Sequence, residues 1–386
     1  MYDILTLNKI AKCGTDAFDK AKYTVADAVE NPDAIMVRSA AMHDMQFGNK
    51  LLAIARAGAG VNNIPVDRCA EEGIVVFNTP GANANAVKEL VIAGLLLSSR
   101  KVTDAIDWVS TLKGQEDIGK KVEKGKSNFA GPEISGKTLG VIGLGAIGVL
   151  VANAAMSLGM KVIGYDPFLS VKAALSLKPG VKTVTDVNDL YAASDYITIH
   201  VPYNADTKGT IGEKSIAVMK DGVRILNFAR GELADTAAVL AAVESGKIAC
   251  YITDFPSDEL IGVKNVICVP HLGASTPESE DNCAVMAASE LIDYIENGNI
   301  RNSVNFPNAE MNAAGTKICV LHKNVPAVIS EITTILGKAS INIDNMINAS
   351  KKDYAYTLID AAGDISEDIA AKLSAAENVI KVRVIK

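Results

Sequence analysis

Thr138-Leu-Gly-Val-Ile-Gly143-Leu-Gly145-Ala-Ile-Gly148 is the stretch that decides the fold of this chain. The apolar run before Gly143 predicts a short buried strand, and the residues from Gly148 to Leu158 predict a helix. In such a turn the first glycine permits a tight bend, the second lets the backbone approach a pyrophosphate, and the third lets the helix pack on the strand. We therefore expect a dinucleotide-binding turn between a strand and a helix.

An acidic residue supports this interpretation. Asp166 directly follows the next predicted strand, 161–165. A carboxylate at that place can accept hydrogen bonds from ribose hydroxyls and repels a 2′-phosphate, so we expect NAD rather than NADP. The N-terminus of the helix would add free N–H groups for the phosphates.

Strands and helices continue to alternate along the chain, which is typical of a doubly wound parallel sheet. After the glycine-rich turn we predict strands at 196–200, 224–228, 249–253 and 266–269, and a helix at 236–245. The first part of the chain shows a looser version of the same pattern, with strands predicted at 34–37, 51–54 and 74–77. The predicted fold class is α/β, with two Rossmann-like doubly wound parallel-sheet domains.

The remaining segments connect these domains or follow them. Long helices are predicted at 85–100 and about 278–297, a surface segment at 113–131, and a linker at 298–315 that is rich in Asn, Pro and Gly. The tail, 316–386, has the order strand, helix, strand, strand, helix, strand, which predicts a ferredoxin-like βαββαβ domain.

Composition excludes several classes of function. The chain has 386 residues, is 49% hydrophobic and 22% charged, and carries a net charge of −7. An acidic chain is a poor general binder of nucleic acid, and its apolar runs are too short to span a membrane. The six cysteines form no Cys-x-x-Cys pair, so we expect no metal site and no disulfide framework. Without a signal-peptide core at the start, we expect a cytoplasmic protein.

Chemically active side chains follow three of the predicted strands. Arg230 follows 224–228, Asp254 and Glu259 follow 249–253, and His271 follows 266–269. The carboxyl ends of parallel strands meet at the edge where open α/β sheets bind ligands. A lone histidine is more often part of the core, but in this context His271 is suited to moving a proton near neutral pH.

A hydride-transfer enzyme that acts on a 2-hydroxy acid needs a base, an acid that orients the base, and a cation for the carboxylate. We assign these roles to His271, Glu259 and Arg230. A carboxylate on the far imidazole nitrogen fixes the tautomer of the base, and the planar arginine fork matches a carboxylate.

The sequence resembles the D-isomer-specific 2-hydroxyacid dehydrogenase family over nearly its whole length. The last matching stretch below is the most specific, and it resembles the branch of the family that acts on phosphoglycerate. The matching stretches are Val37-Arg38-Ser39, Arg56-Ala-Gly58-Ala-Gly60-Val-Asn62, Gly143 to Gly148, Asn227 to Gly231, and Pro270-His271-Leu-Gly-Ala-Ser-Thr276.

The chain departs from the family pattern at two places. Family members usually carry Asp-Val-Phe-x-x-Glu-Pro before the histidine, whereas this chain has Asp254-Phe-Pro-Ser-Asp-Glu259-Leu. Alignment on Phe-Pro would put Asp258 in the position of the acid, so Asp258 stays an alternative to Glu259. Ala59 stands where relatives often offer a threonine near the nicotinamide.

The resemblance implies an activity, a division into domains and a set of binding residues. The activity is the NAD-dependent oxidation of D-3-phosphoglycerate to 3-phosphohydroxypyruvate, the first step of L-serine biosynthesis. The domains are a discontinuous, flavodoxin-like substrate-binding domain of 1–97 and 279–305, an NAD-binding Rossmann domain of 98–278, and a regulatory domain of 316–386. The substrate is expected to contact Arg38, Ser39, Arg56, Ala57 and Gly58, and the cofactor is expected to contact Gly143, Gly145, Ala146, Ile147, Gly148, Asp166, Val201, Pro202, Phe228, Ala229 and Asp254.

The tail resembles an ACT regulatory domain. In related dehydrogenases, residues that match His322, Asn324 and Asn342 hold L-serine between paired domains, so the resemblance implies L-serine as an effector and a homodimer or homotetramer. Ala327 replaces the usual glycine after the proline. A purely structural dimerisation module remains the alternative for the tail.

Two other functions remain open at this stage. One is another 2-hydroxyacid dehydrogenase on the same fold. The other is a non-catalytic, NAD-responsive scaffold, because relatives of this fold serve as corepressors. The presence of Arg230, Glu259 and His271 together favours an enzyme over the scaffold.

Overall fold

The computed structural model describes residues 1–312 and 315–386. It contains two compact units: unit 1 is 1–83 with 277–386, and unit 2 is 84–276. Residues 313 and 314 of the expected linker lie outside the described residues. Two expectations from the sequence stay proposals: that 316–386 forms a domain of its own, and where the domain boundaries fall.

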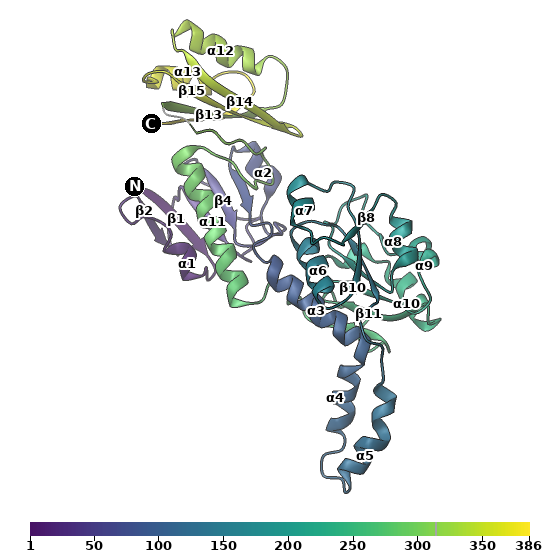
Figure 1. Cartoon of the computed structure of the whole chain (residues 1–386). Coiled ribbons are helices and arrows are strands. Elements are labelled where there is room, and N and C mark those ends of the chain that lie inside the picture. The colour runs from purple at the N-terminus through teal and green to yellow at the C-terminus, as the bar shows by residue number, and fades with distance from the viewer. Residues whose placement is uncertain (313–314) are drawn as a thin grey trace. The chain divides into compact units, whose positions relative to one another are not determined.

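Unit 2 is built around a parallel sheet with the strand order β12-β11-β10-β9-β6-β7-β8 (Figure 1). The sheet confirms the doubly wound fold predicted from the glycine-rich turn. Strand order reverses beside β6, which is the point where such sheets bind ligands. The strands are β6 (Thr138–Ile142), β7 (Lys161–Tyr165), β8 (Lys182–Val184), β9 (Tyr196–Ile199), β10 (Val223–Asn227), β11 (Ile248–Thr253) and β12 (Val266–Cys268).

Helices cover this sheet, so its central strands are buried and their sequences are continuous apolar runs. All four residues of β9 are buried, for example. The helices and 3₁₀ turns of unit 2 are α3 (Ala84–Arg100), α4 (Val102–Ser110), α5 (Ile118–Gly125), η1 (Lys126–Phe129), α6 (Ala146–Ser157), α7 (Val171–Ser176), α8 (Val187–Ala193), α9 (Glu213–Val218), η2 (Gly231–Leu233) and α10 (Thr236–Glu244).

The segment 113–131 lies at the surface as expected, and it is largely helical. With α4 it forms an arm that extends away from the sheet of unit 2 (Figure 1). The ring centroids of Trp108 and Phe129 lie 5.2 Å apart and join the two sides of the arm. Both helices of the arm are amphipathic, but neither contains a buried residue, and apolar side chains such as Ile106 and Val109 of α4 and Ile118 of α5 stay exposed.

Unit 1 contains two sheets. The first is parallel, with the order β2-β1-β3-β4-β5, and the second is antiparallel, with the order β14-β15-β13-β16. The second sheet and its helices confirm the βαββαβ order predicted for the tail. The elements are β1 (Tyr2–Leu7), α1 (Lys12–Thr15), β2 (Tyr23–Ala26), β3 (Ala34–Val37), β4 (Ala53–Arg56), α2 (Val66–Glu71), β5 (Val75–Asn78), α11 (Pro277–Asn297), β13 (Thr316–Lys323), α12 (Val328–Lys338), β14 (Ile343–Lys351), β15 (Tyr354–Ala361), α13 (Glu367–Ser374) and β16 (Val379–Ile385).

The tail shares a hydrophobic core with the rest of unit 1. Leu321 and Tyr356 of the tail belong to the same buried cluster as Leu291 and Tyr294 of α11. Arg383 donates hydrogen bonds to the carbonyls of Tyr294 and of the next residue, at 3.1 and 2.8 Å. The last carbonyls of a helix have no partner inside the helix, and the Tyr294 carbonyl also accepts from the Gly298 N–H at 3.0 Å, so this part-buried cation adds to the capping of the C-terminus of α11.

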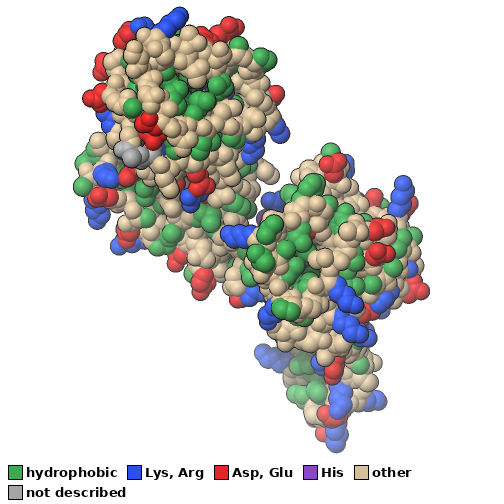
Figure 2. Space-filling view, turned by 45° about the horizontal axis from the view of Figure 1, so that its top comes forward, with side chains coloured by type: hydrophobic (Ala, Val, Ile, Leu, Met, Phe, Trp, Pro, Cys, Tyr) green, Lys and Arg blue, Asp and Glu red, His purple; other side chains and the backbone are tan. Residues whose placement is uncertain are grey.

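The surface carries charges of both signs. On the face shown in Figure 2, basic and acidic side chains are interspersed, so this face offers no extended basic surface for a polyanion. Among the helices of the described chain, none combines the length and apolar character needed to cross a membrane.

Candidate active site

The glycine-rich loop of unit 2 has the geometry that its three glycines predict. Gly143 has a φ of 90° and its N–H donates to the Tyr165 carbonyl at 2.8 Å, while a Cβ at Gly143 would lie 2.6 Å from the His200 oxygen. A Cβ at Gly148 would collide with the Gly143 carbonyl, whereas a Cβ at Gly145 would meet nothing within 4 Å. The loop is therefore tight at both ends and open at Gly145, which fits the approach of a pyrophosphate.

Asp166 joins the end of β7 to this loop. Its two carboxylate oxygens accept hydrogen bonds from the N–H groups of Leu144 and Phe168, at 2.9 and 2.8 Å. A carboxylate has about four acceptor positions, so ribose hydroxyls can still donate to it. The carboxylate therefore lies where the sequence predicts it, and it also orders the loop.

The other expected cofactor residues fall into two groups. Ala146 and Ile147 form the first turn of α6, and Val201 and Pro202 follow β9, the neighbour of β6. Phe228 differs, because its side chain is buried at 5% exposure against Gly94 of α3. Only its backbone, with that of Ala229, is left to contact a cofactor.

His271 lies at the surface beyond β12, beside a buried carboxylate. Its ring centroid is 4.8 Å from that of Phe255. Asp254 is 1% exposed, and this burial raises the pKa of its carboxyl group, while the charges of His271 and Arg230 and the Gly273 N–H act in the opposite direction. Within the described chain neither Asp254 oxygen has a hydrogen bond of standard geometry, so the stabilisation of its charge is mainly electrostatic.

The two acids considered for the histidine lie elsewhere on the same loop. Asp258 and Glu259 are both exposed, and no hydrogen bond or ion pair joins either of them to His271 among the residues that the structure describes. The carboxylate that interacts with His271 is Asp254, which the sequence assigned to the cofactor. The role of Glu259 remains a proposal.

Arg230 is fixed by a turn within the matching stretch Asn227 to Gly231, in which the role of Asn227 was not predicted. Its Nη1 donates to the Ala229 carbonyl at 2.6 Å, and its own carbonyl accepts from Asn227 Nδ2 at 2.9 Å. Asn227 is fully buried at the end of β10. The only sequence signal for this role was its place in Asn-Phe-Ala-Arg-Gly, three positions before the arginine.

The expected substrate residues of unit 1 lie at the ends of β3 and β4. Arg56 pairs with Val37 in the sheet, and its Nε donates to the Arg38 carbonyl at 3.1 Å. The Arg38 guanidinium forms an ion pair with Glu280 at 2.8 Å, and both side chains are partly exposed. An anionic ligand of Arg38 would therefore compete with Glu280, which is a weak competitor at the surface.

The loop 56–61, called the substrate loop below, already uses the N–H groups that the resemblance assigned to substrate. The Ala57 N–H donates to Val37 and the Gly58 N–H to Arg56, both at 2.8 Å. Among the described residues, the N–H groups of Ala59 and Gly60 donate no hydrogen bond, so the available donors begin two residues later than expected.

Asn8 is a second residue that sequence analysis missed. Its Oδ1 accepts from the N–H groups of Ser39 and Ala40, at 3.0 and 2.6 Å, and holds the loop after Arg38. Asn8 has a φ of 70°, a conformation that asparagine tolerates better than most residues. An isolated asparagine after a strand gives no signal of this long-range contact.

In the tail, His322 is buried in β13 and both of its ring nitrogens are occupied. Nδ1 is hydrogen-bonded to the Lys323 carbonyl at 2.8 Å and Nε2 to Thr357 Oγ1 at 2.9 Å. A ligand could bind this ring only by replacing one of these bonds.

The two expected partners of His322 are exposed. Asn324 Nδ2 donates to the Lys352 carbonyl at 3.0 Å, and Asn342 Nδ2 donates to Asp344 Oδ1 at 2.7 Å. No hydrogen bond joins His322, Asn324 and Asn342 to one another in the described part of the tail. An effector site at these residues therefore remains a proposal.

Comparison with known proteins places this geometry in a family. The family model described as D-isomer specific 2-hydroxyacid dehydrogenase, NAD binding domain, matches residues 92–273. The chain is 34% identical over 343 residues to the D-3-phosphoglycerate dehydrogenase of Escherichia coli, covering 86% of this chain and 80% of that protein. It is 38% identical over 291 residues to the D-3-phosphoglycerate dehydrogenase of Archaeoglobus fulgidus, covering 72% of this chain and 52% of the relative, so it spans about half the length of that protein.

A solved structure agrees with these matches. The NAD⁺-bound 3-phosphoglycerate dehydrogenase of Entamoeba histolytica superposes with a TM-score of 0.61 at 27% identity, covering 80% of this chain and 99% of that chain. The chain belongs to the D-isomer specific 2-hydroxyacid dehydrogenase family and carries its NAD-binding domain.

Proposed function

We propose that this chain is an NAD-dependent dehydrogenase that oxidises D-3-phosphoglycerate at C2 to 3-phosphohydroxypyruvate, the first step of L-serine biosynthesis. The observation that carries the reaction class is His271 beside the buried Asp254, on a sheet that also carries the glycine-rich loop. The relatives named D-3-phosphoglycerate dehydrogenase support the choice of substrate.

The residues divide the chemistry among them. His271 removes the proton of the C2 hydroxyl, and Asp254 stabilises the imidazolium that forms. Arg230 binds the substrate carboxylate, while Arg38 and Arg56 supply positive charge for a phosphate that carries −1.5 to −2 at neutral pH. Bound NAD supplies the hydride acceptor, and Gly143, Gly145, Gly148 and Asp166 would hold it.

The test is an assay of NADH absorbance with D-3-phosphoglycerate and NAD, in which we expect turnover by the unmodified chain. His271→Ala should lower turnover by about 10²- to 10⁴-fold, the usual contribution of general acid–base catalysis. Turnover only with a different 2-hydroxy acid would support the reaction class but would refute D-3-phosphoglycerate as the substrate. NAD binding without turnover of any 2-hydroxy acid would favour the non-catalytic scaffold.

We further propose that L-serine binds the tail through His322, Asn324 and Asn342 and lowers turnover, in a cytoplasmic homodimer or homotetramer. The three residue types match the ACT pattern. Amide groups can form hydrogen bonds with both the amino group and the carboxylate group of serine. Because the tail shares a core with α11, truncation would expose apolar surface. Asn342→Ala in the full chain is therefore the better variant, and it should abolish serine inhibition. Insensitivity of the unmodified chain, with no serine binding by calorimetry, would refute the effector.

A further inference from the structure

The segment after α11 is joined edge to edge to β5 of the first sheet. Ser303 and Phe77 form an antiparallel bridge, and the Val304 N–H donates to the Val76 carbonyl at 2.9 Å. Asn305, only 7% exposed, completes the pairing, because its Oδ1 accepts from the Val76 N–H at 3.0 Å. Breaking buried hydrogen bonds of this kind is costly, so this segment and β5 move together.

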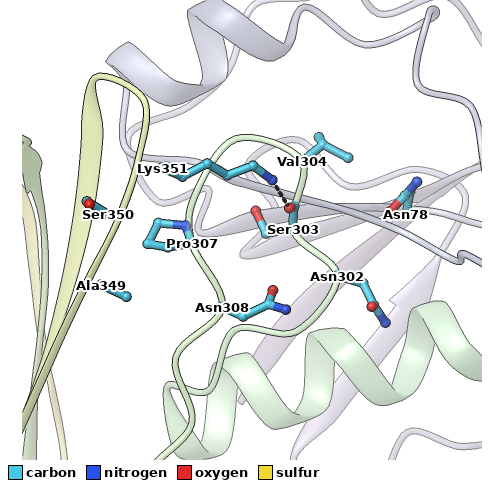
Figure 3. A pocket seen from close by; sticks show the side chains of 9 residues that line it. All are labelled: Asn78, Asn302, Ser303, Val304, Pro307, Asn308, Ala349, Ser350 and Lys351. Carbon is cyan, nitrogen blue, oxygen red and sulfur yellow. Dashed lines mark hydrogen bonds between the residues drawn. The ribbon is translucent and has the colours of Figure 1, made fainter. Parts of the chain in front are cut away.

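Lys351, the last residue of β14, holds this segment from the tail. Its Nζ donates to the Ser303 carbonyl at 2.7 Å, across a pocket of about 630 Å³ that Asn78 and Asn302 also line (Figure 3). Burial and the charge of Lys352 lower the pKa of the Lys351 ammonium group. The contact is a charge-assisted hydrogen bond in a partly desolvated place, so it is stronger than a surface ion pair.

The carboxyl end of β5 holds the substrate loop. Asn78 Nδ2 donates to the Ala59 carbonyl at 2.5 Å, and the Thr79 N–H donates to the Gly58 carbonyl at 3.1 Å. The Asn78 N–H also meets the Asn302 carbonyl at 3.4 Å, beside the residue that Lys351 holds. Consecutive contacts therefore lead from the tail to the backbone of the substrate loop, all within unit 1.

We propose that Lys351 is a positioning residue for the substrate loop, which it reaches through Ser303, β5 and Asn78. The inference deepens the proposed function and rests on it, because it names the contact by which the tail sets the affinity for a phosphorylated hydroxy acid. Loosening of this contact frees the end of β5 and lets the substrate loop leave its binding geometry.

Loss of Lys351 leaves the tail docked, because other buried contacts hold it. Lys381 Nζ donates to the Leu51 carbonyl at 2.7 Å, and Tyr356 donates to the Gly298 carbonyl at 2.6 Å. The effect of a Lys351 variant is therefore local, and the full chain can be used to measure it.

The kinetic test compares Lys351→Met with Lys352→Met. Lys352 is exposed and its side chain makes no hydrogen bond or ion pair within the described residues, so the control removes the same charge one position away. In Lys351→Met the KM for D-3-phosphoglycerate should rise roughly 3- to 20-fold, with kcat and the KM for NAD within about twofold. The control should change none of these. The effects of Lys351→Met and Asn78→Ser should be less than additive, because both act on one path.

Amide hydrogen exchange gives a second measurement that needs no activity. Without ligand, residues 56–61 should exchange several-fold faster in Lys351→Met than in the unmodified chain, while the peptide that contains β6 stays unchanged. Unchanged exchange in the loop, or an equal effect of Lys352→Met, would overturn the inference. If the unmodified chain did not oxidise D-3-phosphoglycerate, the proposed function would fail and exchange alone would decide the role of Lys351.

Discussion

At the scale of single residues, Asp254 is the carboxylate whose charge interacts with that of His271. Replacement of Asp254 by Asn should change the pH profile of kcat/KM, because it removes the carboxylate whose charge interacts with that of His271. The measurement is kcat/KM for oxidation from pH 5 to pH 9, with Asp258→Asn as the exposed control that leaves the profile unchanged. If the pH profile shifted in Glu259→Gln but not in Asp254→Asn, Glu259 rather than Asp254 would be the acid that partners His271.

Asp166 should decide the choice of cofactor. In Asp166→Asn the preference for NAD over NADP should narrow by an amount that corresponds to about 1–3 kcal/mol, the usual range for a hydrogen bond to a charged group. The ratio of kcat/KM for the two cofactors measures this directly. Equal use of NADH and NADPH by the unmodified chain would contradict the role given to Asp166.

The residues that could be predicted from the sequence are those whose role depends on local backbone geometry. Gly143, Gly145 and Gly148 act within one turn, so their spacing alone predicts their roles. Asp254 and Asn8 act through burial and contacts between distant segments, which no local pattern encodes. Sequence analysis therefore assigned Asp254 only to the cofactor and missed Asn8.

At the scale of elements, α11 carries a buried acid with a consequence for stability. Burial raises the pKa of Glu290 to about 8 from its ordinary value of 4.5, although Asn302 donates to its Oε1 at 2.8 Å. Between these values the folded chain keeps a proton that the unfolded chain releases, so the free energy of unfolding falls as pH rises. The contribution of this group should be about 1.4 kcal/mol per pH unit.

Urea unfolding of Glu290→Gln from pH 5 to pH 8 tests this prediction. The variant should lose the part of the pH dependence that comes from Glu290, and it should be more stable than the unmodified chain near pH 8. Glu278→Gln, in the exposed first turn of α11, is the control. Parallel pH curves for Glu290→Gln and the unmodified chain would contradict the prediction.

Elements that bury a periodic apolar face were predicted within a few residues, as α11, β6 and the tail show. Other elements were not. The strands β1 and β2 carry mixed polar sequence, and β4 begins at Ala53 rather than at Leu51, because its pairing with β3 and β5 starts there. The helices of the arm have amphipathic sequences, but they bury no residue of their own chain, so the segment was expected only as surface.

At the scale of the whole molecule, the shared core predicts that the tail is needed for the stability of unit 1. Gly298 has a φ of 70°, and a Cβ there would lie 2.5 Å from the Cys319 sulfur. Gly298→Ala should therefore lower the free energy of unfolding by about 1–3 kcal/mol, through backbone strain and overpacking. Gly337→Ala in α12, where a Cβ meets nothing within 4 Å, should instead stabilise by about 0.5–1 kcal/mol. An equal effect of the two substitutions in urea unfolding would argue against a shared core.

The central claim is that the chain acts on a phosphorylated 2-hydroxy acid, and the reverse reaction tests it most directly. The measurement is kcat/KM with NADH for 3-phosphohydroxypyruvate, glyoxylate, pyruvate and 2-oxoglutarate. We predict the highest value for 3-phosphohydroxypyruvate, because Arg38 and Arg56 add positive charge for a phosphate that carries about −1.5 to −2, whereas pyruvate and glyoxylate have no second anionic group and 2-oxoglutarate has only a single further charge. A value for pyruvate or glyoxylate that equals or exceeds the value for 3-phosphohydroxypyruvate would contradict the claim.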